Sequence, residues 1–334
     1  MFLFLPLGHD RTVYSYPWVT FLLVGICTLI HAGGWVVQRD AEERLEAAAA
    51  RAERVIQQHP EARIHWQPAD LPQELVGAFF GRVFEPNAAR SHPGDAELDA
   101  AMHDFLDAIW DMPAQRFGYR PGRPRGYTAL TSMFSHGDFL HLFGNMIFLF
   151  LSGSVIEYFW RRGPYLVLYL GGGFLATIAH HISAPTSMAP LVGASGAISA
   201  LLGAFVVGHP KTSVRIGYFV FYLVGATRGV LQLPAWFCIP TWAAFQFFGA
   251  SAGQSTGTAY WCHIGGFVVG ILAALVMKYM GWVLPEEEET EWVPDPAYAS
   301  TPAPAFASVP PPATTRRYVE PIDLTTSSDE LPTL

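Results

Sequence analysis

The feature that most constrains this chain is a run of apolar residues long enough to cross a membrane. Residues 191–208 read LVGASGAISALLGAFVVG and contain no charged side chain. A helix of about 17 to 25 apolar residues spans the hydrocarbon core of a bilayer. The whole chain is 51% hydrophobic and only 14% charged, which is typical of membrane proteins. We therefore predict an all-α, multi-pass membrane protein.

Five further stretches have the length and composition of membrane helices, which gives a bundle of six spans. With residues 191–208 as the fourth, the predicted spans are 14–37, 139–156, 165–182, 191–208, 231–250 and 258–282. The segment 214–230 is also apolar, but Arg215 and Arg228 interrupt it. We interpret that segment as a membrane-surface or re-entrant loop.

The predicted spans divide the chain into five parts. They are a leader at 1–13, the first span at 14–37, an extramembrane insert at 38–126, a core at 127–284 and a tail at 285–334. The insert contains two helix candidates: 40–58, which is rich in Ala, Glu and Arg, and 95–110, which is amphipathic. Its helix formers suggest that it could pack as a small extramembrane subdomain. The tail is rich in Pro, Thr, Ser and Ala, and we expect it to be disordered.

Short loops between spans predict the orientation in the membrane. Lys and Arg occur in the loops after the second and fourth spans, at Arg161, Arg162, Lys211, Arg215 and Arg228. The loops 183–190 and 251–257 have neither residue. Because short loops rich in Lys and Arg face the cytoplasm, we expect both termini there and the insert outside. A bacterial inner membrane is the location we expect.

Several function classes are unlikely on composition. The formal net charge of −8 owes much to the tail, and no basic patch with interleaved aromatic residues suggests nucleic-acid binding. Cys27, Cys238 and Cys262 all lie in apolar stretches without the spacing of a metal site or a disulfide framework. We expect three buried free thiols and no metal or cofactor.

Polar residues in membrane helices are costly, and each suggests a functional site. Ser195 is flanked by Gly193 and Gly196, which leave room for close approach to its hydroxyl. The second span, 139–156, contains His141 and Asn145, and the sixth span, 258–282, contains His263. The second, fourth and sixth spans run in the same direction, so these side chains should lie at about one depth.

This set of residues has the chemistry of a serine hydrolase. A serine hydroxyl needs a base, usually a neutral imidazole, to become a nucleophile. We predict Ser195 as nucleophile and His263 as base, with Asn145, His141 and the Ser195 N–H as oxyanion donors. No carboxylate is available within the predicted spans as a third member, and we expect Asp138 to cap the second helix.

Two glycines on the sixth span predict how the base reaches the nucleophile. Gly266 and Gly270 form a G-x-x-x-G pattern after His263. Such glycines let helices approach closely, and small residues of the fourth span, Ser199, Ala200 and Gly203, would face them.

Three motifs in this order resemble the rhomboid family of intramembrane serine proteases. HLFGN at 141–145 is similar to the family's H-x-x-x-N, GASG at 193–196 to its G-x-S-G, and CHIGGFVVG from Cys262 to its H-x-x-G-x-x-x-G. The resemblance covers about residues 5–280 except most of the insert. It implies a six-span bundle that cleaves membrane-anchored proteins near the membrane surface with a Ser195–His263 dyad, without metal or cofactor.

The same resemblance gives His136 and Glu157 as positions that match recurring family residues. The chain also departs from the pattern. Ser199 stands where some members have an aromatic residue beneath the histidine, and only Arg125 and Tyr127 lie near the place of a Trp-Arg pair. These departures bear on substrate choice and on the packing of His263.

Two alternatives remain at this point. A catalytically silent relative would bind membrane helices without cutting them, although such relatives usually lack the dyad. A metal-dependent membrane hydrolase or transporter would use histidines, drawn from His136, His141, His180, His181 and His263. The chain has no H-E-x-x-H motif and no carboxylate within its predicted spans to support that reading.

For the protease, we expect single-span substrates with helix-weakening residues near the outer end of the span. A polar cavity lined by His141, Asn145, Ser195 and His263 should open to the outside. Residues 231–250 or the loop 251–257 are the predicted gate.

Overall fold

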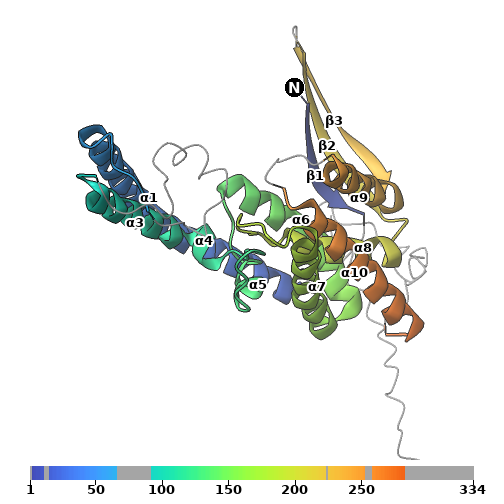
Figure 1. Cartoon of the computed structure of the whole chain (residues 1–334). Coiled ribbons are helices and arrows are strands. Elements are labelled where there is room, and N and C mark those ends of the chain that lie inside the picture. The colour runs from blue at the N-terminus through green and yellow to red at the C-terminus, as the bar shows by residue number, and fades with distance from the viewer. Residues whose placement is uncertain (1, 11–14, 66–91, 223–224, 253–257, 283–334) are drawn as a thin grey trace, which may run out of the picture. The chain divides into compact units, whose positions relative to one another are not determined.

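The computed structural model describes residues 2–10, 15–65, 92–222, 225–252 and 258–282 (Figure 1). Its elements are β1 (Phe2–His9), α1 (Trp18–Gln58), α3 (Asp95–Asp111), α4 (Pro113–Phe117), α5 (Thr128–Thr131), α6 (Phe139–Trp160), α7 (Arg162–Ser183), α8 (Ser195–Gly208), β2 (Ser213–Tyr222), β3 (Gly225–Pro234), α9 (Ala235–Ser251) and α10 (Tyr260–Tyr279). All belong to one compact unit, Met1–Leu284. The predicted disordered tail is a separate unit that lies outside the described residues.

The core of this unit is a helical membrane bundle, as predicted, with α8 at its centre. Helix α8 packs against α6, α7, α9 and α10, and most of its side chains are buried. Within the described residues, α1, α6, α7 and α10 are long and apolar enough to cross a membrane. Helices α8 and α9 correspond to the predicted fourth and fifth spans and are shorter, with 14 and 17 residues.

The fourth helix begins later than predicted. Residues 191–194 are not helical, and α8 begins at Ser195 itself instead of four residues before it. Non-helical backbone at membrane depth is tolerated where it is buried in protein or lines a cavity, and other helices surround this segment. The change places Ser195 at the N-terminus of the helix, where backbone N–H groups lack partners within the helix.

Helix α1 does not end with the first predicted span. It continues for 41 residues through the predicted insert helix at 40–58. Ala, Glu and Arg between residues 40 and 58 are strong helix formers, and no glycine or proline interrupts them. The predicted second insert helix, 95–110, is present as α3, and it packs along the C-terminal half of α1 (Figure 1).

This pair of helices has a hydrophobic core of its own. Its buried members include Val55 of α1, Ile64 after it, and Leu98 and Met102 of α3. A buried carboxylate, Asp95, joins the two chain segments at the start of α3. It accepts hydrogen bonds from the Arg63 and His92 backbone N–H groups at 2.9 and 3.1 Å and from His65 Nε2 at 2.9 Å.

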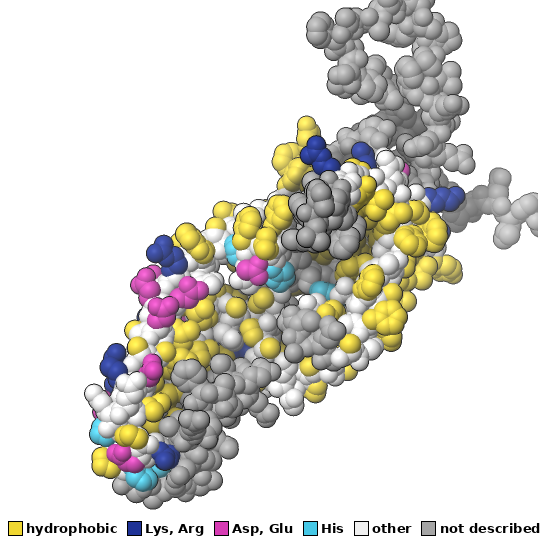
Figure 2. Space-filling model, turned by 90° about the horizontal axis from the view of Figure 1, so that it is seen from above, with side chains coloured by type: hydrophobic (Ala, Val, Ile, Leu, Met, Phe, Trp, Pro, Cys, Tyr) yellow, Lys and Arg dark blue, Asp and Glu magenta, His cyan; other side chains and the backbone are white. Residues whose placement is uncertain are grey.

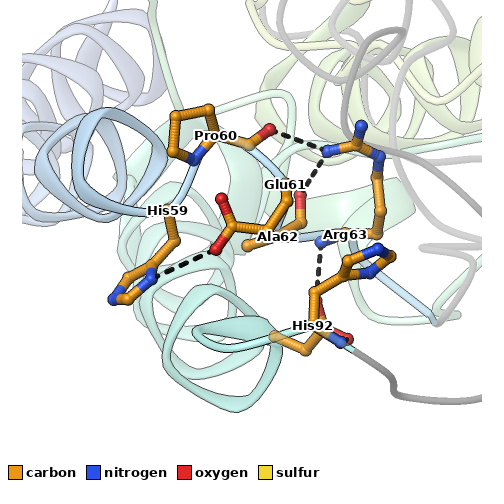
Figure 3. A network of polar contacts seen from close by, with 7 residues as sticks. His59, Pro60, Glu61, Ala62, Arg63 and His92 are labelled. Atoms are coloured by element: carbon orange, nitrogen blue, oxygen red, sulfur yellow. Dashed lines mark hydrogen bonds and ion pairs between the residues drawn. The ribbon is translucent and has the colours of Figure 1, made fainter.

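The backbone around Asp95 is held by a second set of contacts. The Arg63 guanidinium donates to the carbonyls of Pro60 and Ala62 at 2.9 Å each, and the His59 ring lies 3.5 Å from the Glu61 carboxylate (Figure 3). Over its described residues, the insert therefore contains two helices that pack on a core of their own, at the two positions where the sequence indicates helices.

A three-stranded antiparallel sheet is the main feature that the sequence analysis missed. Its order is β1-β2-β3, with Phe4 opposite Tyr218 and Gly217 opposite Val230. The interpretation of 214–230 as a surface or re-entrant loop was therefore wrong, because β2 and β3 form a hairpin there. Valine, isoleucine, tyrosine and phenylalanine in β2 favour a strand.

The sheet also includes part of the predicted leader and moves the start of the fifth helix. Within the leader, Phe2–His9 form the edge strand β1, and Asp10 Oδ1 accepts from the Ser213 N–H at 2.9 Å next to β2. Residues 231–234 belong to β3, so the fifth helix begins at Ala235 and not at Leu231. Pro234 precedes the helix, where its missing N–H has no cost.

Glu157 stabilises the start of α1 from the far end of α6. Pro17 offers no side-chain cap for α1, and the buried Glu157 carboxylate takes that role. It accepts from the Val19 and Thr20 backbone N–H groups at 2.9 and 2.8 Å and from the Thr20 hydroxyl at 2.9 Å. A negative charge at a helix N-terminus is favourable, so this contact fixes α1 against the bundle.

Candidate active site

Ser195 lies within hydrogen-bond distance of His263. The two side chains come from α8 and α10, and Ser195 Oγ is 2.8 Å from His263 Nε2. Both residues are half-buried. The structure therefore brings together the predicted nucleophile and base, which are 68 residues apart in the sequence.

Glycines bring α10 close enough to α8 for this contact. A Cβ atom on Gly266 would collide with the Gly196 carbonyl, and one on Gly270 would collide with the Ala200 carbonyl. On the other helix, Gly203 lies against the backbone of Phe267. The two helices thus touch backbone to backbone at the positions that the sequence analysis singled out.

The turn before Ser195 also depends on glycine. Gly193 has φ = +116°, a conformation that residues with a side chain rarely adopt. A Cβ atom there would lie 2.7 Å from His141 Nε2. Gly196, just beyond the serine, has no room for a Cβ beside Cys262 Sγ. Because glycines stand on both sides of Ser195, no bulky side chain of the turn covers the serine hydroxyl.

His141 and Asn145 face this turn from α6. Asp138 caps the helix as predicted, accepting from the His141 N–H at 2.9 Å. Asn145 is buried, and within the described residues its Nδ2 has no hydrogen-bond partner. An unpaired buried donor is unfavourable and calls for an explanation. The predicted oxyanion donors therefore lie next to the serine turn.

His136 holds the backbone of the same turn. Its Nε2 accepts from the Ala194 N–H at 3.4 Å, and its ring meets His141 edge to face with centroids 5.3 Å apart. Burial, together with the charge of nearby His141, lowers the pKa of His136 to about 4. A neutral imidazole can accept this bond at neutral pH. His136 fixes the loop and does not contact Ser195 Oγ.

Two residues of α9 contact His263, and the sequence analysis missed both roles. His263 Nδ1 is 2.8 Å from Gln246 Oε1, and the Trp242 ring lies 6.1 Å from the imidazole at 35°. Their spacing of four residues puts them on one helix face, which was a signal available in the sequence. Ser199, which stands where some rhomboid proteases have an aromatic residue, donates to the Ser195 carbonyl at 2.7 Å. The aromatic ring beside His263 is Trp242 and comes from α9.

The residues around the serine line a cavity of about 680 Å³. His141, Asn145, Ser195 and His263 all line it, and Trp242 covers one side. Figure 2 shows histidine side chains in a hollow among hydrophobic side chains. The volume lies within the usual range of ligand pockets, about 300 to 1,000 Å³.

The chain that enters the bundle from the insert supports the cavity wall. Tyr119 pairs with Leu191 in an antiparallel bridge, and the Gly122 N–H donates to the Ser187 carbonyl at 2.8 Å. Next to Tyr119, the buried Arg120 stacks over the Trp110 ring of α3 at 4.3 Å. The insert and the loop before Ser195 are therefore mechanically connected.

The remaining candidate residues lie outside the serine–histidine contact. His180 lines the cavity, and His181 Nδ1 is 2.9 Å from the Tyr119 hydroxyl. In the described part of the chain, no three His, Cys, Asp or Glu side chains gather as metal ligands. All three cysteines are free. Cys27 and Cys262 are buried, and Cys238 is half-buried.

Comparisons with known proteins agree with this architecture. Residues 123–280 match the family model of the rhomboid domain. Presenilin-associated rhomboid-like protein A, mitochondrial, from Danio rerio is 27% identical over 180 residues, covering 51% of this chain and 44% of the relative. Putative rhomboid protease YdcA from Bacillus subtilis (strain 168) is 31% identical over 91 residues, covering 27% and 45%.

A plant protein is similar to this chain over a segment of intermediate length. RHOMBOID-like protein 12, mitochondrial, from Arabidopsis thaliana is 32% identical over 114 residues, covering 29% of this chain and 33% of the relative. The chain spans less than half the length of each of these three relatives.

Fold and site together define a multi-pass helical membrane protein with a serine–histidine pair in a cavity of its bundle. Residues 123–280 form a rhomboid domain, and the three relatives are all rhomboid-like proteins. Two of the relatives are named as mitochondrial and one comes from a bacterium, so the comparisons favour no particular membrane.

Proposed function

We propose that this protein is an intramembrane serine endopeptidase that cleaves transmembrane segments of membrane-anchored proteins. The observation that carries the proposal is the 2.8 Å contact between Ser195 Oγ and His263 Nε2 at the N-terminus of α8. A serine beside an imidazole is the arrangement that nucleophilic acyl transfer requires. The family and the putative protease among the relatives support the same activity.

The residues account for both halves of the reaction. His263 takes the Ser195 proton as Oγ attacks the peptide carbonyl, and the protonated imidazole then gives that proton to the leaving amine. A water molecule next loses a proton to His263 and attacks the acyl-enzyme ester, which releases the acid and restores the serine hydroxyl. No metal or cofactor takes part in these steps.

The oxyanion of each tetrahedral intermediate needs donors that are already in place. The Ser195 N–H lies in the first turn of α8, where the helix dipole also favours negative charge. Asn145 Nδ2 is buried next to this turn, and in the part of the chain that the structure describes it has no competing partner. His141 borders the same space. These three groups would bind the oxyanion.

The substrates we propose are single-span proteins within the lipid bilayer. A helix in lipid keeps its carbonyls in its own hydrogen bonds, so it must unwind before it is cut. Glycine and proline lower the cost of unwinding, which favours substrates with such residues near the outer end of the span. Helix α9 covers one side of the cavity through Trp242, which supports α9 as the gate. Most of the other predicted gate, 251–257, lies outside the described residues.

We also propose that both termini face the cytoplasm, in a bacterial inner membrane, so that cleavage occurs near the outer face. The support is the distribution of Lys and Arg among the short loops. Labelling single cysteines at 161 and 186 with a membrane-impermeant thiol reagent would test the orientation, in a variant whose native cysteines are replaced. The outer residue, 186, should react in intact cells, and reaction at 161 would reverse the topology.

A catalytically silent protein that binds membrane helices is the alternative function. A fluorophosphonate probe separates the two, because it forms a bond to a serine oxygen only where a base activates that oxygen. We expect labelling at Ser195 that is lost in Ser195→Ala. The matched control is Ser154→Ala, since Ser154 is a buried helix serine whose hydroxyl donates to the Leu151 carbonyl of its own helix. An unlabelled wild-type protein would support the silent alternative.

A further inference from the structure

One hydrogen bond of the site has no part in the reaction described above. It joins His263 Nδ1 to Gln246 Oε1 over 2.8 Å, from α10 to α9. The other ring nitrogen, Nε2, faces Ser195 Oγ at the same distance. Both imidazole nitrogens are thus engaged, one by the serine and one by a side-chain amide.

We infer that Gln246 is a positioning residue that holds His263 in the tautomer needed for catalysis, an inference that rests on the proposed protease function. A neutral imidazole has one N–H donor and one acceptor nitrogen. Because the Gln246 carbonyl oxygen only accepts, it selects the form with hydrogen on Nδ1. Nε2 is then left unprotonated and can take the Ser195 proton.

Gln246 thus stands where serine hydrolases in water usually have a carboxylate. In the usual triad an aspartate orients the histidine through the same ring nitrogen and stabilises the imidazolium that forms. A charged carboxylate within a bilayer is costly, whereas a neutral amide is less so. The amide dipole still stabilises a positive imidazolium, because its oxygen carries partial negative charge.

The surroundings of Gln246 support a specific role. The residue is half-buried on a helix most of whose side chains are exposed, and the neighbouring Phe245 is 67% exposed. Trp242 lies one turn away on the same face, with its ring against His263 and edge to face with Phe267. Helix α9 therefore restricts the imidazole with one hydrogen bond and one ring contact.

Three variants test the inference with a model single-span substrate in liposomes. Gln246→Leu removes the acceptor and should lower kcat by about 10–100-fold with little change in KM, by analogy with the loss when the partner that orients a metal-bound histidine is removed. Gln246→Glu keeps an acceptor and should retain much of the turnover. Phe245→Leu, a change at the exposed neighbour, should behave as wild type.

The pH profile separates positioning from simple packing. Activity needs neutral His263, so it falls as the pH drops through the pKa of that residue. A carboxylate next to an imidazole raises its pKa, so the acidic limb of Gln246→Glu should move to higher pH by about one unit or more. A purely structural Gln246 would give low activity in both variants without this shift, and that result would overturn the inference.

A measurement on the wild-type protein tests the inference without turnover and without any variant, so it holds even if the variants fail to fold. Nitrogen NMR of ¹⁵N-histidine protein should show the His263 signal with hydrogen on Nδ1 in the wild type. Hydrogen on Nε2 would overturn the inference, as would wild-type kcat in Gln246→Leu. Either failure would leave Ser195 labelled by the fluorophosphonate, whereas an unlabelled Ser195 would remove the proposed function itself.

Discussion

The two sides of His263 are built in different ways. Towards α8 the contact is between backbones, with Gly266 and Gly270 against the carbonyls of Gly196 and Ala200. Towards α9 the contact is between side chains, with Gln246 and Trp242 around the ring. The first side allows little adjustment and sets how near the base comes to Ser195. The second side sets which way the imidazole points.

This difference suggests which substitutions abolish activity and which reduce it. A change at the glycine contact alters the distance between base and nucleophile together with the packing of the bundle. A change on the α9 side leaves the bundle packed and alters only the orientation or protonation of the ring. The predictions below follow that order, beginning with the two reacting groups.

The largest expected effect is complete loss of turnover in His263→Ala. Without the base, the Ser195 hydroxyl loses the imidazole 2.8 Å away that takes its proton, and neither member of such a pair functions alone. Thermal unfolding should change little. Cleavage of a model substrate by wild type and variant measures the effect, and substantial residual cutting would identify a different base.

The next effect is expected at the glycine contact. Gly266→Val should reduce both activity and the melting temperature, because a side chain there meets the Gly196 carbonyl and the Ser199 Cβ. Gly171→Val is the matched control, since a Cβ on Gly171 of α7 meets no atom within 4 Å. Differential scanning fluorimetry in detergent gives the stability. A stable and active Gly266→Val protein would show that distance is not set there.

The oxyanion side should give an intermediate effect. Asn145→Ala should lower kcat by roughly 10²–10³-fold, the usual loss for one such donor, with KM nearly unchanged. Steady-state kinetics on the liposome substrate separates the two constants. A loss confined to KM would make Asn145 a binding or packing residue.

The smallest expected effect concerns pH and the loop before Ser195. Burial lowers the pKa of His136 from 6.5 to about 4, so its contribution to stability is complete above pH 6.5 and is lost as the pH falls towards 4. His136→Gln keeps an acceptor for the Ala194 N–H without the titration. Its melting temperature should fall less between pH 7 and pH 5, by about 2–4 °C for each kcal/mol involved.

The outcome that would contradict this last prediction comes from the same melting experiment. Equal pH dependence in His136→Gln and wild type would mean that protonation of His136 does not weaken the fold.

The sequence predicted the bundle and the serine–histidine meeting for a physical reason. Ionisable and polar residues are rare enough in membrane helices that His141, Ser195 and His263 stood out from their surroundings. Their order on alternate spans then placed them at one depth. The glycines at 266 and 270 predicted a close contact because only glycine allows backbones to touch.

Other features could not be read because apolar composition does not distinguish a strand from a helix within a short segment. Residues 213–234 are largely apolar in either case, and β2 pairs with Phe2–His9, which lies far away in the sequence. The start of α8 follows the turn at Gly193, and that turn is held by His136 from a distant part of the sequence. Gln246 looked like one polar residue among many apolar neighbours, and its role appeared only when α9 lay beside α10.

The central claim is that Ser195 cuts a peptide bond inside the membrane, near the outer end of the substrate span. The most direct measurement is mass spectrometry of the products from a single-span substrate reconstituted with the wild-type protein, Ser195→Ala or Ser154→Ala. We predict one main cut near the outer end, faster when a Gly-Ala pair is placed there, equal in Ser154→Ala and absent in Ser195→Ala. Cleavage that persists in Ser195→Ala, or cuts at the cytoplasmic end, would contradict the account.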